Sequence, residues 1–66
     1  MKYSELEKIL KTQGSDFHHN GAKHPMWKSA LTGRTFPMSH HRNQEVKQGT
    51  LKSILTASGA KIYPRN

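Results

Sequence analysis

The 66-residue chain contains no cysteine. It can therefore form neither a disulfide framework nor a thiolate zinc site. Apolar residues make up only 32% of the sequence, which is enough for one thin core but too little to enclose a buried cofactor. We therefore expect a single domain over residues 1–66, with its chemistry at the surface and with no metal or small-molecule cofactor.

A long apolar segment is also lacking. The N-terminal stretch MKYSELEKIL has no apolar run of signal-peptide length, and it carries Glu5 and Glu7 where a signal peptide avoids acidic residues. No segment combines a long apolar side with a basic opposite side, which disfavours adsorption to a membrane. These features predict a cytoplasmic protein that has no membrane partner.

Acidic residues are few, since four Asp and Glu stand against eleven Lys and Arg. The formal net charge is +7 with histidine neutral, and five histidines add to it as the pH falls through about 6.5. This excess favours a polyanionic partner, nucleic acid first. A basic protein that its charge merely keeps dispersed in solution is the simpler alternative.

Two stretches have the periodicity and end signals of short helices. In YSELEKILKTQG, Ser4 is the predicted N-cap and Gly14 the terminator, which gives a helix of about residues 4–13 with Glu7 completing a capping box. In GTLKSILTASG, Thr50 is the predicted N-cap of a helix of about residues 50–58 that Gly59 ends. Each helix carries one short apolar stripe, made of Leu6, Ile9 and Leu10 in the first and Leu51, Ile54 and Leu55 in the second.

The middle of the chain breaks at Asn20-Gly21 and at Thr32-Gly33. Asn-Gly between extended runs is a strong hairpin signal, so the three remaining runs predict strands of about residues 15–19, 23–28 and 34–38 in an antiparallel meander. The order of elements is then α-β-β-β-α. It predicts a two-layer α+β domain with both helices packed on one face of a three-stranded antiparallel sheet.

Alternation along the second strand decides which face is buried. Pro25 and Trp27 share one face, while His24, Met26 and Lys28 share the other. Burying a tryptophan removes apolar surface from water at about 25 cal/mol per Å², whereas burying an unpaired imidazole or ammonium costs several kcal/mol. Trp27 should therefore face the helices.

The same argument divides the remaining residues of the sheet. The buried layer should include Trp27, Phe17, Phe36 and Met38. The open face and the first hairpin should carry Lys23, His24 and Lys28, with Arg34 at the start of the third strand close enough to contribute.

Three stretches resemble the HicA toxin family, the small mRNA interferases of HicAB toxin–antitoxin modules. They are the opening helix that ends at Gly14, the segment GAKHPMWKSALTGRTFPM, and the segment EVKQGTLKSILTASG, whose Lys-x-Gly-Thr-Leu-x-x-Ile-Leu run is the most diagnostic. The resemblance extends over nearly the whole chain. It implies a fold like a double-stranded-RNA-binding domain, an endoribonuclease that cleaves mRNA to arrest translation and growth, and a HicB antitoxin as the neutralising partner.

The resemblance also assigns site residues. The functional histidine of the family falls on His24, preceded at the matching spacing by Gly21, the turn residue of the site, and His41 matches a histidine often present in relatives. Lys23 stands where relatives often have Asn, Ser or His, and Pro25 follows the histidine directly, so both depart from the family pattern. Each departure bears on the pose of the imidazole without removing it.

Histidine suits RNA cleavage because the 2′-hydroxyl of RNA can attack the neighbouring phosphorus once a base accepts its proton. His24 is the predicted general base or acid, and Lys23, Lys28 and Arg34 are predicted to hold phosphate groups, with His41 as a further RNA contact. A second proton carrier would help the 5′-oxygen to leave. The candidates are His18, His19 and His41, which the sequence does not rank; adjacent strand residues point to opposite faces, so at most one of His18 and His19 should reach the site.

Two alternatives remain open at the level of sequence. The first is a non-catalytic module that grips RNA through its phosphates and leaves it intact. The second is a metal site built from the five histidines. The paired histidines do not have the i, i+2 or i, i+4 spacing at which imidazole ligands converge, which disfavours this second alternative.

Overall fold

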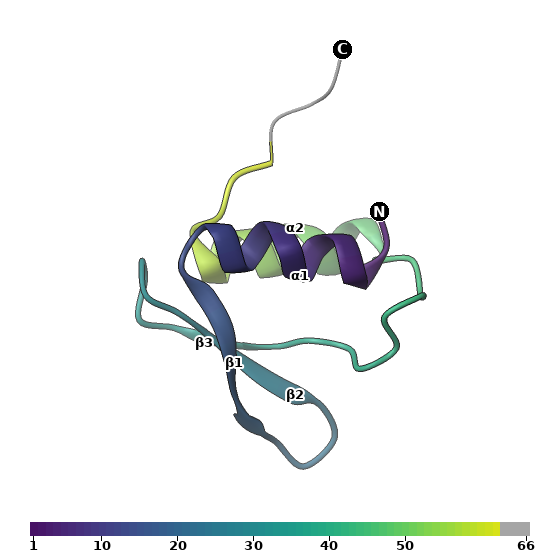
Figure 1. The fold of residues 1–66 in the computed structure, drawn as a ribbon, viewed down its shortest axis with the longest axis horizontal. Helices are drawn as coiled ribbons and strands as arrows, with labels where there is room; N and C mark the ends of the chain where they lie inside the picture. The colour runs from purple at the N-terminus through teal and green to yellow at the C-terminus, as the bar shows by residue number, and fades with distance from the viewer. Residues whose placement is uncertain (63–66) are drawn as a thin grey trace.

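The computed structural model describes residues 1–62 and shows two helices on one face of a three-stranded antiparallel sheet (Figure 1). The elements are α1 (Tyr3–Thr12), β1 (Ser15–Asn20), β2 (Pro25–Ser29), β3 (Thr35–Pro37) and α2 (Gln48–Ser58). The predicted α+β class and order of elements are confirmed. Residues 63–66 of the expected domain lie outside the described part.

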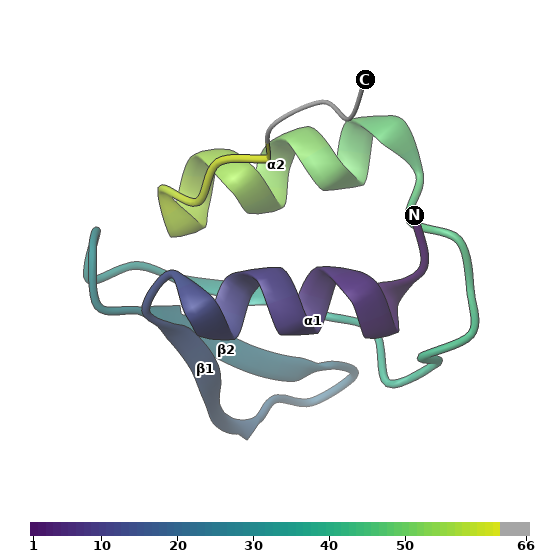
Figure 2. The same ribbon diagram turned by 45° about the horizontal axis from the view of Figure 1, so that its top comes forward.

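The sheet has the order β1-β2-β3, and the two helices divide its covered face between them. α1 packs on β1, whereas α2 packs on β2 and β3. Both helices run in the same direction (Figures 1 and 2). Their N-terminal ends therefore lie at the same end of the helical layer.

The first helix begins earlier than the capping pattern predicts. It starts at Tyr3, with Lys2 as the N-cap in place of Ser4. The carboxylate that closes the first turn is that of Glu5, which accepts a hydrogen bond of 3.3 Å from the Lys2 backbone N–H, and not that of Glu7. The predicted capping box of Ser4 and Glu7 is therefore wrong.

The physical reason lies in a distant loop. The N–H groups of Tyr3 and Ser4 donate to the carbonyl oxygens of Gln44 and Arg42, at 3.1 and 3.0 Å. The first turn of a helix needs partners for its free N–H groups, and here backbone carbonyls supply them in place of a serine hydroxyl. The helix can therefore extend to include Tyr3, whose ring joins the core.

The second helix also begins before its predicted cap. Its N-cap is Lys47, so Thr50 lies within the first turn and the prediction of Thr50 as the cap is wrong. The predicted end is confirmed, because Gly59 adopts a left-handed conformation with φ of 71° and its N–H donates to the Leu55 carbonyl at 2.9 Å. A glycine adopts this conformation without the strain that a side chain adds.

The strands differ at their ends from the predicted ranges. β2 begins at Pro25, so Lys23 and His24 belong to the hairpin loop and not to the strand. β3 is limited to Thr35–Pro37, and Arg34 precedes it. Pro25 at the start of β2 and Pro37 at the end of β3 fit strand ends, since a proline has no N–H to donate to the ladder.

The core lies between the helices and the covered face of the sheet. Its buried apolar residues are Tyr3, Leu6, Leu10, Trp27, Phe36, Met38, Ile54, Ala57 and Ala60. Trp27 and Phe36 lie opposite each other on β2 and β3 and are 5% and 3% exposed. The Lys11 ammonium of α1 lies 5.8 Å from the centroid of the Trp27 ring. The prediction that Trp27 faces the helices is confirmed.

One predicted core residue is not buried. Phe17 pairs with Trp27 across β1 and β2, but it is 50% exposed. β1 is an edge strand, and the β1–β2 hairpin extends away from the helical layer (Figure 1). Phe17 therefore has the predicted neighbour but lies at the edge of the sheet, half in solvent, and its placement in the core is wrong.

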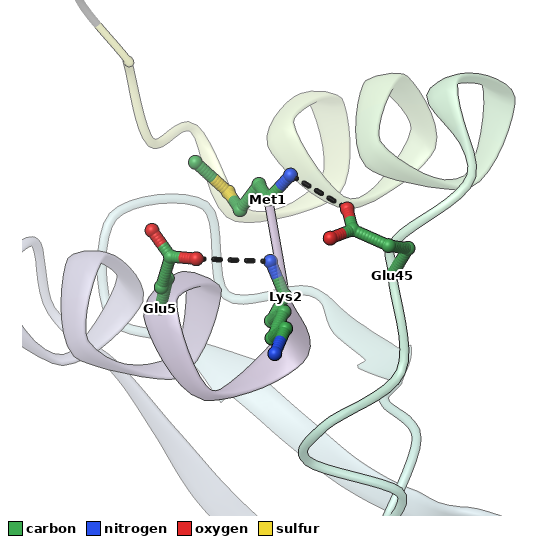
Figure 3. A network of polar contacts seen from close by, with 4 residues as sticks. All are labelled: Met1, Lys2, Glu5 and Glu45. Atoms are coloured by element: carbon green, nitrogen blue, oxygen red, sulfur yellow. Dashed lines mark hydrogen bonds and ion pairs between the residues drawn. The ribbon is translucent and has the colours of Figure 1, made fainter.

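The segment before α2 is fastened to the N-terminus. The Met1 ammonium lies 2.8 Å from a carboxylate oxygen of Glu45, close to the bond between Lys2 and Glu5 (Figure 3). The Val46 N–H donates to the Met1 carbonyl at 2.9 Å. The hydrogen bond and charge of Glu45 raise the pKa of the Met1 ammonium, and the hydrogen bond and charge of that ammonium lower the pKa of Glu45.

Replacement of Trp27 by alanine should destabilise the fold strongly. We expect Trp27→Ala to lower the free energy of unfolding by about 3–5 kcal/mol, because a large buried side chain is lost. Phe17→Ala is the matched control, and it should cost less than about 2 kcal/mol because half of that side chain already lies in water. Urea unfolding measures both values, and equal losses would contradict the assignment of the buried face.

The ion pair between Met1 and Glu45 should make stability depend on pH at two limits. The raised pKa of the ammonium means that its contribution is complete below about pH 8 and is lost as the pH rises through the raised value. The lowered pKa of Glu45 means that its contribution is present above about pH 4 and is lost as the pH falls through the lowered value.

The measurement is the melting temperature of the wild type and of Glu45→Gln across this pH range. The wild type should melt slightly higher between about pH 5 and 8, and the difference should shrink toward both limits. Acetylation of the Met1 amino group should abolish the same difference, because it removes the ammonium charge. A difference that stays constant from pH 3 to pH 10 would disprove this role of the pair.

Candidate functional site

His24 is held at the end of the first hairpin by its backbone. The N–H of Gly21 donates to the His24 carbonyl at 2.9 Å, and this bond closes the loop between β1 and β2. A Cβ atom on Gly21 would lie 3.0 Å from that carbonyl oxygen and 3.1 Å from Cγ of Met26. Gly21 therefore has a steric role, since it lets the hairpin close tightly on the backbone that carries the imidazole.

The His24 side chain lines a small cleft where the sheet meets the N-terminal ends of both helices. The cleft has a volume of about 240 Å³ and is lined by Tyr3, His24, Pro37, Met38, Ser39 and Thr50. Tyr3 comes from the first turn of α1 and Thr50 from the first turn of α2. Three segments that are distant in the sequence thus meet around one imidazole.

The His24 imidazole is exposed to solvent. Within residues 1–62 the structure contains no hydrogen bond or ion pair to either of its ring nitrogens. A ring nitrogen without an internal partner is free to exchange a proton with a bound molecule. Three hydroxyl-bearing side chains of the cleft, Tyr3, Ser39 and Thr50, can donate hydrogen bonds to the same molecule.

The lysines near His24 occupy two different places. Lys23 is its neighbour in the exposed hairpin loop. Lys28 is exposed on the open face of β2, but four residues of strand place it roughly 13 Å from His24 along the chain. Lys28 also pairs in register with Asp16 of β1, which places an acidic residue opposite it. Only Lys23 is adjacent to the imidazole.

Arg34 lies on a different surface from the one expected. It lines hollows that include Gly49, Lys52 and Ser53, so it stands beside α2. Thr35, the next residue, pairs with Lys28 and faces the open side of the sheet. Neighbouring residues along an extended chain point to opposite sides, which separates Arg34 from Lys28 and corrects the expectation that Arg34 is close enough to contribute to the open face. Its role as a phosphate contact stays a prediction.

The other histidines form two pairs outside the described lining of the cleft. The Nδ1 atoms of His18 and His19 are 2.7 Å apart, and the two rings meet edge to face. A β-bulge between Phe17 and His19 interrupts the alternation of the strand and brings the adjacent rings together, so the expectation that they point to opposite faces is wrong. His40 and His41 lie in the loop after β3, with ring centroids 4.3 Å apart.

His18, His19 and His41, the three candidates for a second proton carrier, are therefore absent from the described lining of the cleft. Arg42, in the same loop as His41, lies 3.6 Å from a carboxylate oxygen of Glu7 and is engaged with α1.

Among residues 1–62, no group of three or more His, Asp or Glu side chains is arranged to hold a metal ion. The described helices are also too short and too polar to cross a bilayer.

Sequence reasoning missed the three hydroxyl-bearing residues of the cleft. Thr50 had a signal, because it lies in the Lys-x-Gly-Thr-Leu run that resembles the family, but it was interpreted as a helix cap. Tyr3 and Ser39 had none, since their approach to His24 depends on how α1 and the loop after β3 pack at one end of the sheet.

Comparison with known proteins identifies the family. The model of the family described as HicA toxin of bacterial toxin-antitoxin matches residues 3–60. The chain belongs to the HicA toxin family. It is 36% identical over 61 residues to a protein of Pseudomonas fluorescens named probable mRNA interferase HicA, a match that covers 92% of this chain and 98% of the relative. No solved structure matches it significantly.

The residues that match the HicA family model include all the elements that build the cleft. The matched range of residues 3–60 begins at Tyr3, contains the hairpin of Gly21 and His24, and extends beyond the end of α2. The cleft is therefore made entirely of residues within the family domain.

Replacement of Gly21 by alanine should disturb the hairpin that carries His24. We expect Gly21→Ala to lower the free energy of unfolding by about 1 kcal/mol or more, because its Cβ meets a backbone oxygen that cannot move aside cheaply. Urea unfolding and the NMR amide shifts of His24 and Met26 measure the effect. Ala22→Ser, a change in the neighbouring exposed residue, should leave the free energy of unfolding and the amide shifts unchanged. If Gly21→Ala also leaves both unchanged, the hairpin does not close as tightly on His24 as described.

Proposed function

We propose that this chain is the toxin of a toxin–antitoxin module and acts as an endoribonuclease that cleaves mRNA. Its membership of the HicA family and the name of its Pseudomonas fluorescens relative, probable mRNA interferase HicA, support this proposal. The net charge of +7 agrees with a polyanionic substrate. Cleavage of mRNA in the cytoplasm would arrest translation and growth.

The observation that best supports the proposal is the exposure of the His24 side chain and its lack of an internal hydrogen-bond partner in the described part of the chain. Its imidazole is exposed in a cleft of about 240 Å³ and has no internal hydrogen-bond partner within residues 1–62. An imidazole titrates near neutral pH, where one group can both accept and donate a proton. We assign His24 the role of general base or acid.

The reaction uses a nucleophile that the substrate brings. His24 accepts the proton of a ribose 2′-hydroxyl, and the resulting oxygen attacks the adjacent phosphorus. The bond from phosphorus to the 5′-oxygen then breaks, which leaves a 2′,3′-cyclic phosphate on one fragment. The 5′-oxygen takes a proton from solvent water and becomes a 5′-hydroxyl on the other fragment, and His24 later returns its proton to solvent. The step requires no metal ion, because neither activation of a water molecule nor a covalent enzyme intermediate is involved.

Other residues of the cleft would stabilise the phosphate. Negative charge grows on its oxygens as the attack proceeds, and hydrogen-bond donors already in place lower the barrier. Tyr3, Ser39 and Thr50, which each carry a hydroxyl group, line the cleft with His24, and Lys23 is the neighbouring residue in the hairpin loop. The phenol of Tyr3 comes from a buried ring, so its position is fixed before RNA binds.

We propose a HicB-like antitoxin as the protein partner that covers this cleft and blocks access to His24. The family to which the chain belongs supports this assignment. Met26, which lies half-buried on the open face of the sheet next to the hairpin, offers an apolar contact for such a partner.

A non-catalytic RNA-binding module is the second candidate function. It is favoured by the absence of a second imidazole from the described lining of the cleft, since many proton-transfer sites use two such groups. The two candidates differ in a single result. If the purified protein binds RNA with steep salt dependence and leaves the RNA intact, it is a binding module and not a nuclease.

Replacement of His24 should abolish cleavage and preserve the fold. We expect His24→Ala and His24→Gln to cleave mRNA at least about 100-fold more slowly, because the proton acceptor is lost. Both variants should unfold within about 0.5 kcal/mol of the wild type, since the side chain is exposed. Growth arrest on expression should disappear, while binding to the antitoxin remains.

His40→Ala is the matched control, because it removes an exposed imidazole from a loop position outside the described lining of the cleft. This variant should cleave mRNA at the rate of the wild type. A His24→Ala variant that still cleaves mRNA and still arrests growth would contradict the role of His24 as general base or acid.

A further inference from the structure

The cleft at His24 is one end of a longer groove. It shares Pro37 and Thr50 with a second hollow of about 330 Å³, which follows β3 and α2. That hollow shares Arg34 and Ser53 with a third hollow of about 350 Å³. We call this chain of hollows the seam groove, because it follows the boundary between the edge strand β3 and α2.

The far end of the seam groove is basic. Arg34 and Lys52 line it, and both are exposed. All four acidic residues of the chain lie outside β3 and α2, at Glu5, Glu7, Asp16 and Glu45. Glu45 is the nearest of them to α2 in the sequence, and it is paired with the Met1 ammonium. Within residues 1–62, the side-chain charge along β3 and α2 is therefore positive, which suits an anionic ligand.

The position of Arg34 is built into the fold. The hydroxyl of Thr32 donates to the Ala57 carbonyl near the end of α2 at 2.6 Å, and the Arg34 N–H donates to the same hydroxyl at 3.2 Å. The buried hydroxyl of Ser29 donates to the Ser58 carbonyl at 2.6 Å. These bonds fasten the turn between β2 and β3 to the end of α2, so the backbone of Arg34 is placed before any ligand arrives.

The dimensions and chemistry of the seam groove suit a single strand of nucleic acid. Three residues of extended chain separate Pro37 from Arg34, which is roughly 10 Å. Thr50 and Ser53 line the groove between its two ends, and hydroxyl side chains of this kind can contact phosphate or ribose oxygens. A duplex presents two backbones across a wide shallow groove, whereas this seam accommodates one.

We propose that the seam groove binds the sugar–phosphate backbone of single-stranded RNA that flanks the cleavage position, with Arg34 and Lys52 as phosphate contacts. This proposal rests on the proposed function of His24, and it adds the path of the substrate. The cleavage position lies at His24, and the adjoining nucleotides run along β3 and α2 toward Arg34. The seam groove increases affinity for RNA chains long enough to reach both ends.

The test compares Arg34→Gln and Lys52→Gln with Lys8→Gln, an exposed lysine of α1 that serves as the matched control. Each variant carries His24→Ala as well, so that single-stranded RNA is bound and not consumed. Affinity is measured over a range of salt concentrations. Each groove substitution should reduce the slope of log affinity against log salt by about 0.7, because one phosphate contact is lost, and the control should not change it.

A cleavage assay with the intact His24 separates failure of the groove from failure of the proposed function. Arg34→Gln and Lys52→Gln should lower kcat/KM for a long RNA and leave it unchanged for a dinucleotide, which has no backbone to reach Arg34. If the wild type cleaves both substrates but the groove variants have the same kcat/KM for the long RNA as Lys8→Gln, the proposed role of the seam groove is overturned. The proposed nuclease function then still holds.

Two further outcomes are decisive. If the wild type cleaves no RNA while the groove substitutions still reduce the salt slope, the nuclease is overturned and the groove stands as an RNA site. If Arg34→Gln and Lys52→Gln weaken binding of a purified HicB-like antitoxin and leave RNA affinity unchanged, the groove is a protein interface and the proposal is overturned.

Discussion

The pairing of Trp27 with Phe36 beneath the helices sets the geometry of the rest of the protein. Two large rings opposite each other on neighbouring strands fix both the buried face of the sheet and the register of β3 against β2. A slip of β3 by one residue would turn Phe36 away from the helices, and the same slip of β2 would expose Trp27 and place Lys28 under the helices. This register brings Pro37 to the start of β2, where His24 lies, and it leaves Arg34 at the other end of β3 beside α2. The site and the groove are thus consequences of core packing.

Because His24 lies just outside β2, the side chain proposed for catalysis does not contribute to the packing that stabilises the fold. The strand is held by its buried face, whereas the imidazole lies in a loop that Gly21 closes with one backbone hydrogen bond. A side chain in such a place can be exposed and without an internal partner at little cost to the fold. The cleft around it is completed by Tyr3 and Thr50, which come from the first turns of the two helices. Parallel helices bring those turns to the same end of the molecule (Figure 2).

Sequence patterns predicted the features that depend on local periodicity. The buried face of Trp27 and the end of α2 at Gly59 follow from spacing. The predicted helix stripes are confirmed in part, because Leu6, Leu10 and Ile54 are buried whereas Ile9, Leu51 and Leu55 are only half-buried. The helix starts were missed because carbonyls of a distant loop satisfy the first N–H groups of α1. Phe17 was misplaced because an edge strand extends past its covering helix, and Arg34 because its side depends on where β3 begins. These are tertiary effects, and no short window of sequence contains them.

The account of function depends on the claim that His24 activates a hydroxyl of the substrate itself. The most direct measurement is the chemical identity of the ends that the purified protein produces from a defined RNA, compared with the same RNA carrying a 2′-deoxy ribose at the cleavage position. The account predicts a 2′,3′-cyclic phosphate with a 5′-hydroxyl from the first RNA and no cleavage of the second. Fragments with a 5′-phosphate and a 3′-hydroxyl, or cutting of the 2′-deoxy RNA, would contradict it.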